Sequence, residues 1–179
     1  MSKKLISKQK ATNEVSVVIV TYNSEAYIVK CISSIYTYVN DLPSLEIIVV
    51  DNNSNDNTIS RINEKFSSIS IIINRKNEGF SKAINQGINI AKGKNIFILN
   101  PDSKLKNNAI SLLLKKINNS NYKIIGPEIQ KENGELQNSK WKFPTLFTTI
   151  CGFVYLDFML CSYINTSSYT AIRFPVRGC

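Results

Sequence analysis

Four short polar segments of the sequence carry side chains that could hold a phosphorylated ligand. Each segment follows an apolar run rich in β-branched residues and supplies carboxylates, amides or hydroxyls. Such groups form hydrogen bonds with a base or a ribose, and a carboxylate can also ligate a hard cation. One polar segment after a strand is expected by chance, whereas several indicate a binding site. The segments span residues 21–23, 51–54, 74–79 and 100–102.

Three residues of these segments have the clearest chemistry. Asp51 follows an apolar run and could accept hydrogen bonds from a base N–H group or from ribose hydroxyls. Gly79 begins an expected helix, and the first backbone N–H groups of that helix could bind a phosphate. Asp102 could coordinate Mg²⁺ or Mn²⁺ together with a diphosphate, because such ions often take only one or two protein carboxylates. The plainer interpretation of Asn100-Pro101-Asp102 is a turn with no other role.

The composition and the missing motifs exclude several classes of site. The sequence contains no His, which excludes imidazole acid–base catalysis and His-based zinc sites. Its cysteines show no CxxC spacing, so neither a redox pair nor a zinc site is indicated. Neither the GxGxxG fingerprint of dinucleotide-binding domains nor the GxxxxGKS/T motif of the P-loop occurs. A nucleotide site in this chain therefore has to be built from carboxylates, amides and backbone N–H groups.

The elements that would position these groups alternate between strands and helices. Ser24 is expected to cap the first helix, with Glu25 in its first turn, and Gly93 to end the third helix. The apolar run 96–99 predicts a strand covered on both faces. The order predicts an α/β fold with a mostly parallel sheet flanked by helices on both faces, in which ligands bind beyond the carboxyl ends of the strands. The expected strands are 15–21, 45–50, 69–74 and 95–99, and the expected helices are 24–38, one ending at 66, 79–93 and 107–117.

The net charge and its distribution bear on partners and location. The formal charge of +9 indicates an anionic partner such as phosphates, a nucleotide or an acidic membrane surface. No nucleic acid is expected, because no cluster of basic residues alternates with aromatic residues. Residues 1–13 predict a solvated basic tail rather than a signal peptide, and the cysteine pattern fits a reducing cytosol, so a cytoplasmic protein is expected. Residues 146–164 are apolar but contain Asp157, which favours peripheral contact with the inner membrane face over a spanning helix.

Taken together, the motifs resemble those of family 2 glycosyltransferases, and most of all the rhamnosyltransferase-like branch that builds bacterial surface polysaccharides. The resemblance covers residues 14–145 and implies the GT-A fold. It also implies inverting transfer of a sugar, with rhamnose among the candidates, from a UDP- or dTDP-sugar to a saccharide or lipid-linked acceptor. The matching stretches are VSVVIVTYNSEAYIVKCISSI, EIIVVDNNSNDNT, NRKNEGFSKAINQGINIAKGKNIFILNPD and GELQNSKWKFPT.

The resemblance also assigns individual residues to a site. The family's metal-binding Asp-x-Asp motif takes the form Asn-Pro-Asp in this branch, which implies that Asp102 ligates Mg²⁺ or Mn²⁺ beside the donor diphosphate. Each donor-side residue has a plainer alternative. Tyr22 could only cover the sheet edge and Asn85 could be solvated, while Asn53 and Asn77 could be turn formers. The implied donor-binding residues are Thr21, Tyr22, Asn23, Asp51, Asn53, Ser54, Asn77, Gly79, Asn85 and Asn100.

The catalytic base of the family has no match in the sequence. In the family, a later segment beginning near Trp-x-x-Gly-Ala leads to a Glu-Asp pair whose carboxylate deprotonates the acceptor hydroxyl. The expected organisation is therefore a basic tail over 1–13, a nucleotide-sugar-binding core over 14–145 and an incomplete acceptor-side segment over 146–179. Two functions stay open: an inverting, metal-assisted glycosyltransferase and a non-catalytic nucleotide-sugar-binding fragment. A nucleotidyltransferase is disfavoured, because no Gly-rich basic loop follows the first strand. The carboxylates after Asp102 are Glu128, Glu132, Glu135 and Asp157.

Overall fold

The structure is a computed structural model that describes residues 14–39, 42, 44–131 and 133–137 of the 179-residue chain. The chain divides into two compact units, Met1–Leu114 and Lys115–Cys179. The first unit contains Asp102 and every residue that the sequence assigns to donor binding.

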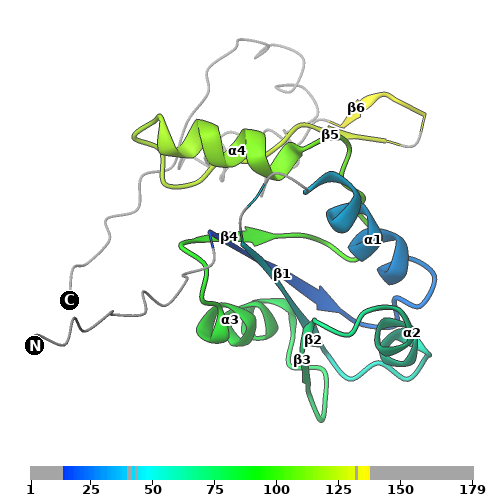
Figure 1. Cartoon of the computed structure of the whole chain (residues 1–179). Coiled ribbons are helices and arrows are strands. Elements are labelled where there is room, and N and C mark those ends of the chain that lie inside the picture. Colours follow the sequence, from blue (N-terminus) through cyan, green and yellow to red (C-terminus); the bar gives the residue numbers. More distant parts are fainter. Residues whose placement is uncertain (1–13, 40–41, 43, 132, 138–179) are drawn as a thin grey trace, which may run out of the picture. The chain divides into compact units, whose positions relative to one another are not determined.

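A four-stranded parallel sheet forms the centre of the first unit (Figure 1). The register pairs Thr21 with Asp51 and Asp51 with Ile73, so three strands end together at one edge. The chain adds β2 and β3 on one side of β1 and then places β4 on its other side. This reversal is a topological switch point, the usual place for a ligand in such sheets. The strands are β1 (Val15–Thr21), β2 (Leu45–Asp51), β3 (Ser70–Ile73) and β4 (Asn95–Ile98).

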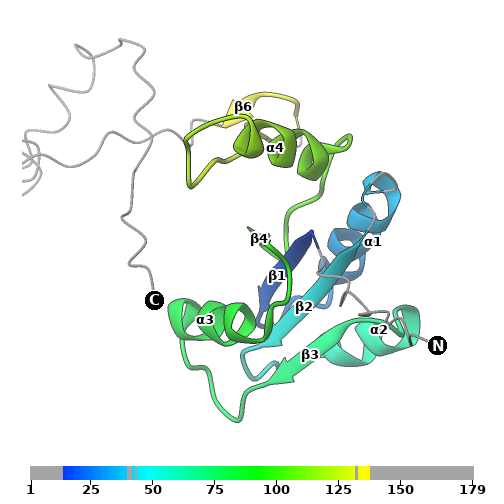
Figure 2. The same ribbon diagram turned by 60° about the vertical axis from the view of Figure 1, so that its left-hand side comes forward.

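Helices cover both faces of the sheet, which confirms the predicted α/β fold (Figure 2). Alternate residues of β1 point to opposite faces, and both sets are buried. Val17 and its neighbours on one face pack against α1 and α2, whereas Val18 and its neighbours pack against α3. A strand buried on both faces explains the continuous β-branched run of β1. The helices are α1 (Ile28–Tyr38), α2 (Thr58–Lys65), α3 (Phe80–Ile90) and α4 (Ala109–Asn118).

Two helix boundaries differ from the predicted ones, while the other boundaries that the sequence predicted match within two residues. α1 begins at Ile28, because residues 24–27 form a turn in which the carbonyl of Ser24 accepts the N–H groups of Tyr27 and Ile28. The Ser24 hydroxyl donates to a carbonyl instead of capping the helix. α3 ends at Ile90, before Gly93. A Cβ on Gly93 would lie 2.4 Å from the backbone nitrogen of Ser16, so close contact with β1 explains this glycine.

The prediction that β4 is covered on both faces is wrong within the described part of the chain. Ile96 and Ile98 are 39 % and 50 % exposed. Phe97, in contrast, packs against the apolar cluster that contains Val17 and lies between the sheet and α1, called here the cluster under α1. The register places Ile98 beside Val18, on the face that α3 covers. α3 packs over β1 and β2 and leaves this face of β4 open.

The second unit is described over a short stretch. Its strands β5 (Ile129–Gln130) and β6 (Leu136–Gln137) pair antiparallel. Among the described residues, no helix is both long and apolar enough to cross a membrane. The predicted basic tail, Glu132 and the apolar segment 146–164 with Asp157 lie outside the described residues.

Candidate functional site

The ends of β1, β2 and β3 bring three of the predicted polar segments together. The N–H of Asn52 donates to the carbonyl of Thr21 (2.8 Å), and the N–H of Asn74 donates to the carbonyl of Asp51 (2.9 Å). Each bond ties the residue that follows one strand to the last residue of the neighbouring strand. Segments 21–23, 51–54 and 74–79 therefore start side by side at one edge of the sheet.

Asp51 holds the loop that follows β2. The residue is 1 % exposed, and its carboxylate oxygens accept the N–H (3.0 Å) and the hydroxyl (2.5 Å) of Ser54. A buried carboxylate with both oxygens engaged has little surface left for a ligand. In this structure the Asp51 carboxylate therefore offers no open surface for the predicted contact with a base or a ribose. It holds the loop after β2 through Ser54 instead.

Two asparagines allow the neighbouring loops to turn and to interlock. Asn23 and Asn53 have φ angles of 49° and 71°, a left-handed conformation that asparagine adopts more readily than most residues. The N–H of Asn23 donates to the Ser54 hydroxyl (2.9 Å), and the side-chain oxygen of Asn23 accepts the N–H of Asn55 (2.8 Å). For Asn53 the backbone supports the turn-forming alternative. For Asn23 the side chain locks the loop after β1 onto the loop after β2.

A network of amide side chains joins the ends of β2 and β3 to α3. Buried Asn52 donates to the side-chain oxygen of Asn77 (2.7 Å) and accepts hydrogen bonds from Asn74 (3.1 Å) and from the N–H of Glu78 (2.9 Å). Asn74 also exchanges two hydrogen bonds with Gln86 of α3 (2.9 and 3.0 Å). Sequence reasoning gave Asn52, Asn74 and Gln86 no individual role. Asn52 and Asn74 stand directly after the last residues of β2 and β3, which is the signal that could have found them.

Gly79 precedes α3 with a φ angle of 81°, a conformation that glycine reaches without steric cost. Its N–H donates to the side-chain oxygen of Asn77 (3.0 Å). This N–H is therefore engaged within the protein. It is not free to donate a hydrogen bond to a phosphate, the role predicted for Gly79. Asn77 connects the start of α3 to Asn52 and so to the end of β2.

The fourth polar segment forms a turn directly after β4. The N–H of Ser103 donates to the carbonyl of Asn100 (3.1 Å), and the side chains of Asn100 and Asp102 are exposed. β4 pairs with β1 in parallel, so this turn lies at the same edge of the sheet as the residues that follow β1.

Asp102 suits a cation that is shared with a phosphorylated ligand. The described residues contain no cluster of three or more Cys, Asp or Glu side chains that could hold a metal ion by themselves. A single exposed carboxylate on a fixed turn fits Mg²⁺ or Mn²⁺, which keeps several water molecules and takes phosphate oxygens as further ligands. Cys31 lies behind the turn. Burial, and to a lesser extent the charge of Asp102, raises the pKa of this thiol to about 12, so it stays protonated.

The remaining predicted residues have unequal exposure. Tyr22 follows β1 and is 47 % exposed, so its ring is available at the edge. Thr21 is buried, and its hydroxyl has no hydrogen-bond partner among the described residues. Asn85 is exposed on the second turn of α3, and no hydrogen bond in the described part of the chain joins it to the loops. The structure therefore brings all the predicted residues except Asn85 to the strand ends or the loops that follow them.

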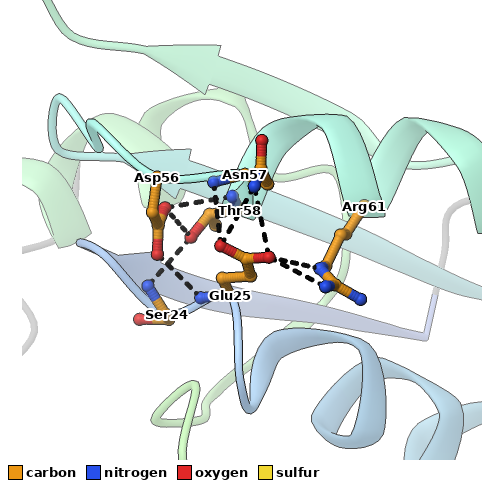
Figure 3. A network of polar contacts seen from close by, with 6 residues as sticks. All are labelled: Ser24, Glu25, Asp56, Asn57, Thr58 and Arg61. Carbon is orange, nitrogen blue, oxygen red and sulfur yellow. Dashed lines mark hydrogen bonds and ion pairs between the residues drawn. The ribbon is translucent and has the colours of Figure 1, made fainter.

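A second polar network supports the loops after β1 and β2 from one side (Figure 3). Glu25 accepts hydrogen bonds from Asn57 and pairs with Arg61 (2.8 Å), and these partners hold the pKa of Glu25 below its usual range. Asp56 accepts hydrogen bonds from Thr58 (2.5 Å) and from the N–H of Glu25 (3.0 Å). Burial works to raise the pKa of Asp56, but these hydrogen bonds outweigh it and lower the pKa. A pocket of about 400 Å³ adjoins the network, lined by Asn23, Glu25, Ala26, Asp56 and Arg61.

Known proteins are similar to this chain in sequence. An uncharacterized glycosyltransferase from Haemophilus influenzae is 34% identical over 76% of this chain and 46% of its own length. A Campylobacter jejuni protein, "GalNAc(5)-diNAcBac-PP-undecaprenol beta-1,3-glucosyltransferase", is 29% identical over 69% of this chain and 40% of its own length. The chain thus spans less than half the length of these relatives.

A solved structure shows the same architecture. The crystal structure of S. aureus TarS 1-349 in complex with UDP-GlcNAc matches 66% of this chain and 38% of its own length, with 22% sequence identity and a TM-score of 0.53. The model of the family described as "Glycosyl transferase family 2" matches residues 16–171. That match includes the loops after all the strands of the parallel sheet, so the chain belongs to glycosyl transferase family 2.

Proposed function

We propose that this chain forms the donor-binding part of an inverting glycosyltransferase that uses a nucleoside diphosphate sugar and a divalent cation. The observation that carries the proposal is the shared edge of β1 and β4. The exposed ring of Tyr22 directly follows β1, and the exposed carboxylate of Asp102 lies in the turn after the neighbouring strand β4. An aromatic ring suits a base, and a carboxylate suits the cation that accompanies a diphosphate.

On the nucleoside side, the proposal gives the buried residues a positioning role. Asp51 holds Ser54, and Ser54 in turn accepts the N–H of Asn23. Asn52 links this loop to Asn77, next to the start of α3. Loops that are ordered before the ligand arrives lose less conformational entropy on binding. Nucleoside contacts would come from the backbone and exposed groups of these loops rather than from the Asp51 carboxylate.

On the diphosphate side, Asp102 would hold Mg²⁺ or Mn²⁺, with Asn100 beside it. When bound, such an ion stabilises the negative charge that develops on the leaving diphosphate. Asp102 is the exposed carboxylate that we assign to this task. Deprotonation of the acceptor then requires a different carboxylate, which we place in the part of the whole protein beyond the described residues.

We infer a UDP-sugar donor and a lipid-linked acceptor. The TarS complex supports UDP, and the name of the Campylobacter relative supports an undecaprenol-linked acceptor. A dTDP-sugar such as dTDP-rhamnose is the second candidate, based on the rhamnosyltransferase-like form of the motif at residues 100–102. A lipid-linked acceptor fits peripheral contact with the inner membrane face, to which the formal charge of +9 would contribute.

Calorimetry with UDP, with and without Mn²⁺, tests the proposal on the full chain. We expect Mn²⁺ to strengthen UDP binding to the unchanged protein. Asp102→Asn should remove this Mn²⁺ effect and leave the melting temperature unchanged, because the side chain is exposed. Glu64→Gln, an equally conservative change at an exposed position of α2, is the matched control and should bind like the unchanged protein. Undiminished Mn²⁺ enhancement in Asp102→Asn would overturn the assignment, and a titration with dTDP distinguishes the two donors.

A further inference from the structure

The turn that carries Asp102 is anchored at both of its ends. Leu99 and Leu105 flank the turn, and both are buried in the cluster under α1. The N–H of Leu99 donates to the carbonyl of Val18 (3.1 Å), which continues the pairing of β4 with β1 past the end of the strand. Residues 100–104, which are exposed or partly buried, are therefore a short arch between two fixed points.

α1 adds two polar contacts to this arch. The thiol of Cys31 lies 3.5 Å from the carbonyl oxygen of Asn100 and donates to it. The hydroxyl of Ser34 accepts the N–H of Leu105 (3.0 Å) and donates to the carbonyl of Cys31 (2.6 Å). Cys31 and Ser34 are three residues apart, so they lie on the same face of the helix. One contact holds the start of the arch, and the other holds its end.

The carbonyl of Asn100 is the central acceptor of this arrangement. It takes the N–H of Ser103, which closes the turn, and the thiol of Cys31, which ties the turn to α1. The turn is therefore held by one hydrogen bond within itself and by one hydrogen bond from α1. Asp102 lies between Asn100 and Ser103, so its backbone position is determined by these contacts while its side chain stays exposed.

We propose that Ser34 and Cys31 of α1 are positioning residues for the cation site, because they hold the arch that presents Asp102. This inference rests on the proposed function. A carboxylate held in place loses less freedom when it binds a cation and a diphosphate than a carboxylate on a loose loop. The two residues contact neither ligand. They act through the backbone of Asn100 and Leu105.

Variants of Ser34 test the proposal in the full chain. In Ser34→Ala, the Mn²⁺ concentration that gives half of the UDP-binding enhancement should rise about 10–100-fold, the usual cost of losing a supporting partner of a metal ligand. Affinity for UDP without Mn²⁺ should stay unchanged, since the loops after β1 and β2 are not touched. Ser33→Ala, which removes an exposed hydroxyl one residue away, should change neither quantity. Ser34→Thr keeps a hydroxyl and should restore much of the Mn²⁺ response.

Cys31 offers a second, size-matched comparison. Cys31→Ser keeps a donor toward Asn100, while Cys31→Ala removes it at nearly the same side-chain volume. The Ala variant should need more Mn²⁺ than the Ser variant. Equal Mn²⁺ requirements in Ser34→Ala, Ser33→Ala and the unchanged protein would overturn the inference, as would an equal loss of Mn²⁺-free UDP binding, which indicates a purely structural role.

Failure of the inference and failure of the proposed function give different results. If Mn²⁺ enhances UDP binding and Asp102→Asn removes the effect, the proposed cation site stands, and only the variants of α1 decide the inference. If Mn²⁺ has no effect on UDP binding by the unchanged protein, the cation site and the inference are both overturned.

Discussion

At the scale of single residues, the site is built by short side chains that bind one another. Asp51 binds Ser54, Asn52 binds Asn74 and Asn77, and these contacts leave few side-chain atoms free. The exposed groups at the edge include Tyr22, Asn100 and Asp102. The division is physical: buried polar groups need partners within the protein, so they shape loops, while exposed groups remain available to a ligand.

Replacement of Asp51 tests this division. Asp51→Ala should lower the free energy of unfolding by about 1–3 kcal/mol, because the N–H and hydroxyl of Ser54 lose their buried acceptor. Denaturant unfolding of Asp51→Ala, Ser54→Ala and the double variant measures the effect. A coupling energy of at least about 0.5 kcal/mol is expected for residues in direct contact. Additive effects of the two changes would show that the pair does not hold the loop.

At the scale of elements, close packing of α3 on the sheet sets how the amide network meets the strand ends. Gly87 faces β1 and β2, and a Cβ there would lie 2.4 Å from Val18 Cγ1 and 3.2 Å from Val50 Cγ2. A glycine inside a helix costs about 1 kcal/mol relative to alanine. Here it permits the close approach that lets Gln86 reach Asn74.

Gly87→Ala should therefore destabilise the protein despite the better helix propensity. Overpacking costs about 1–3 kcal/mol, which exceeds the gain of about 1 kcal/mol in propensity, so we expect a net loss of up to about 2 kcal/mol. Chemical denaturation measures it. Asn89→Ala, at an exposed position of the same helix, is the control and should be neutral or slightly stabilising. A gain in stability for Gly87→Ala would mean that α3 moves away from the sheet at little cost.

At the scale of the whole molecule, the net charge and the uncovered apolar surface both bear on the membrane proposal. The chain carries a formal charge of +9, and Ile96 and Ile98 of β4 are exposed on the first unit. The chain also spans less than half the length of its relatives, so the proposed transfer reaction belongs to the whole protein. In the proposed function the described part supplies the donor edge, and the positive charge of the whole chain would favour contact with an anionic membrane.

Co-sedimentation with liposomes tests the membrane proposal. Binding to vesicles rich in anionic lipid should be strong at low salt and should fall as salt screens the charges, because each basic residue near the surface contributes about 1 kcal/mol. Neutral phosphatidylcholine vesicles are the control and should bind little protein. Equal pelleting without any vesicles would indicate aggregation through apolar surface, and the membrane proposal would be dropped.

The sequence by itself determined the four strands of the parallel sheet, their order along the chain and the polar segments that follow them. β1 and β2 were predicted almost residue by residue, because a strand buried on both faces needs an uninterrupted apolar, β-branched run. The turn at Asn100-Pro101-Asp102 was also readable, since its residues favour that local backbone. Each of these features depends on neighbours in the chain.

Only the tertiary structure decided which polar residues are committed to one another. Ser24 is tied to a distant segment, since its N–H donates to the Thr58 hydroxyl, 34 residues away. Gln86 acquires a role because α3 packs against the end of β3 through Asn74. One face of β4 stays open because α3 lies over β1 and β2. These outcomes depend on contacts between distant segments, and the pattern of residue types does not show which individual side chains will bind one another.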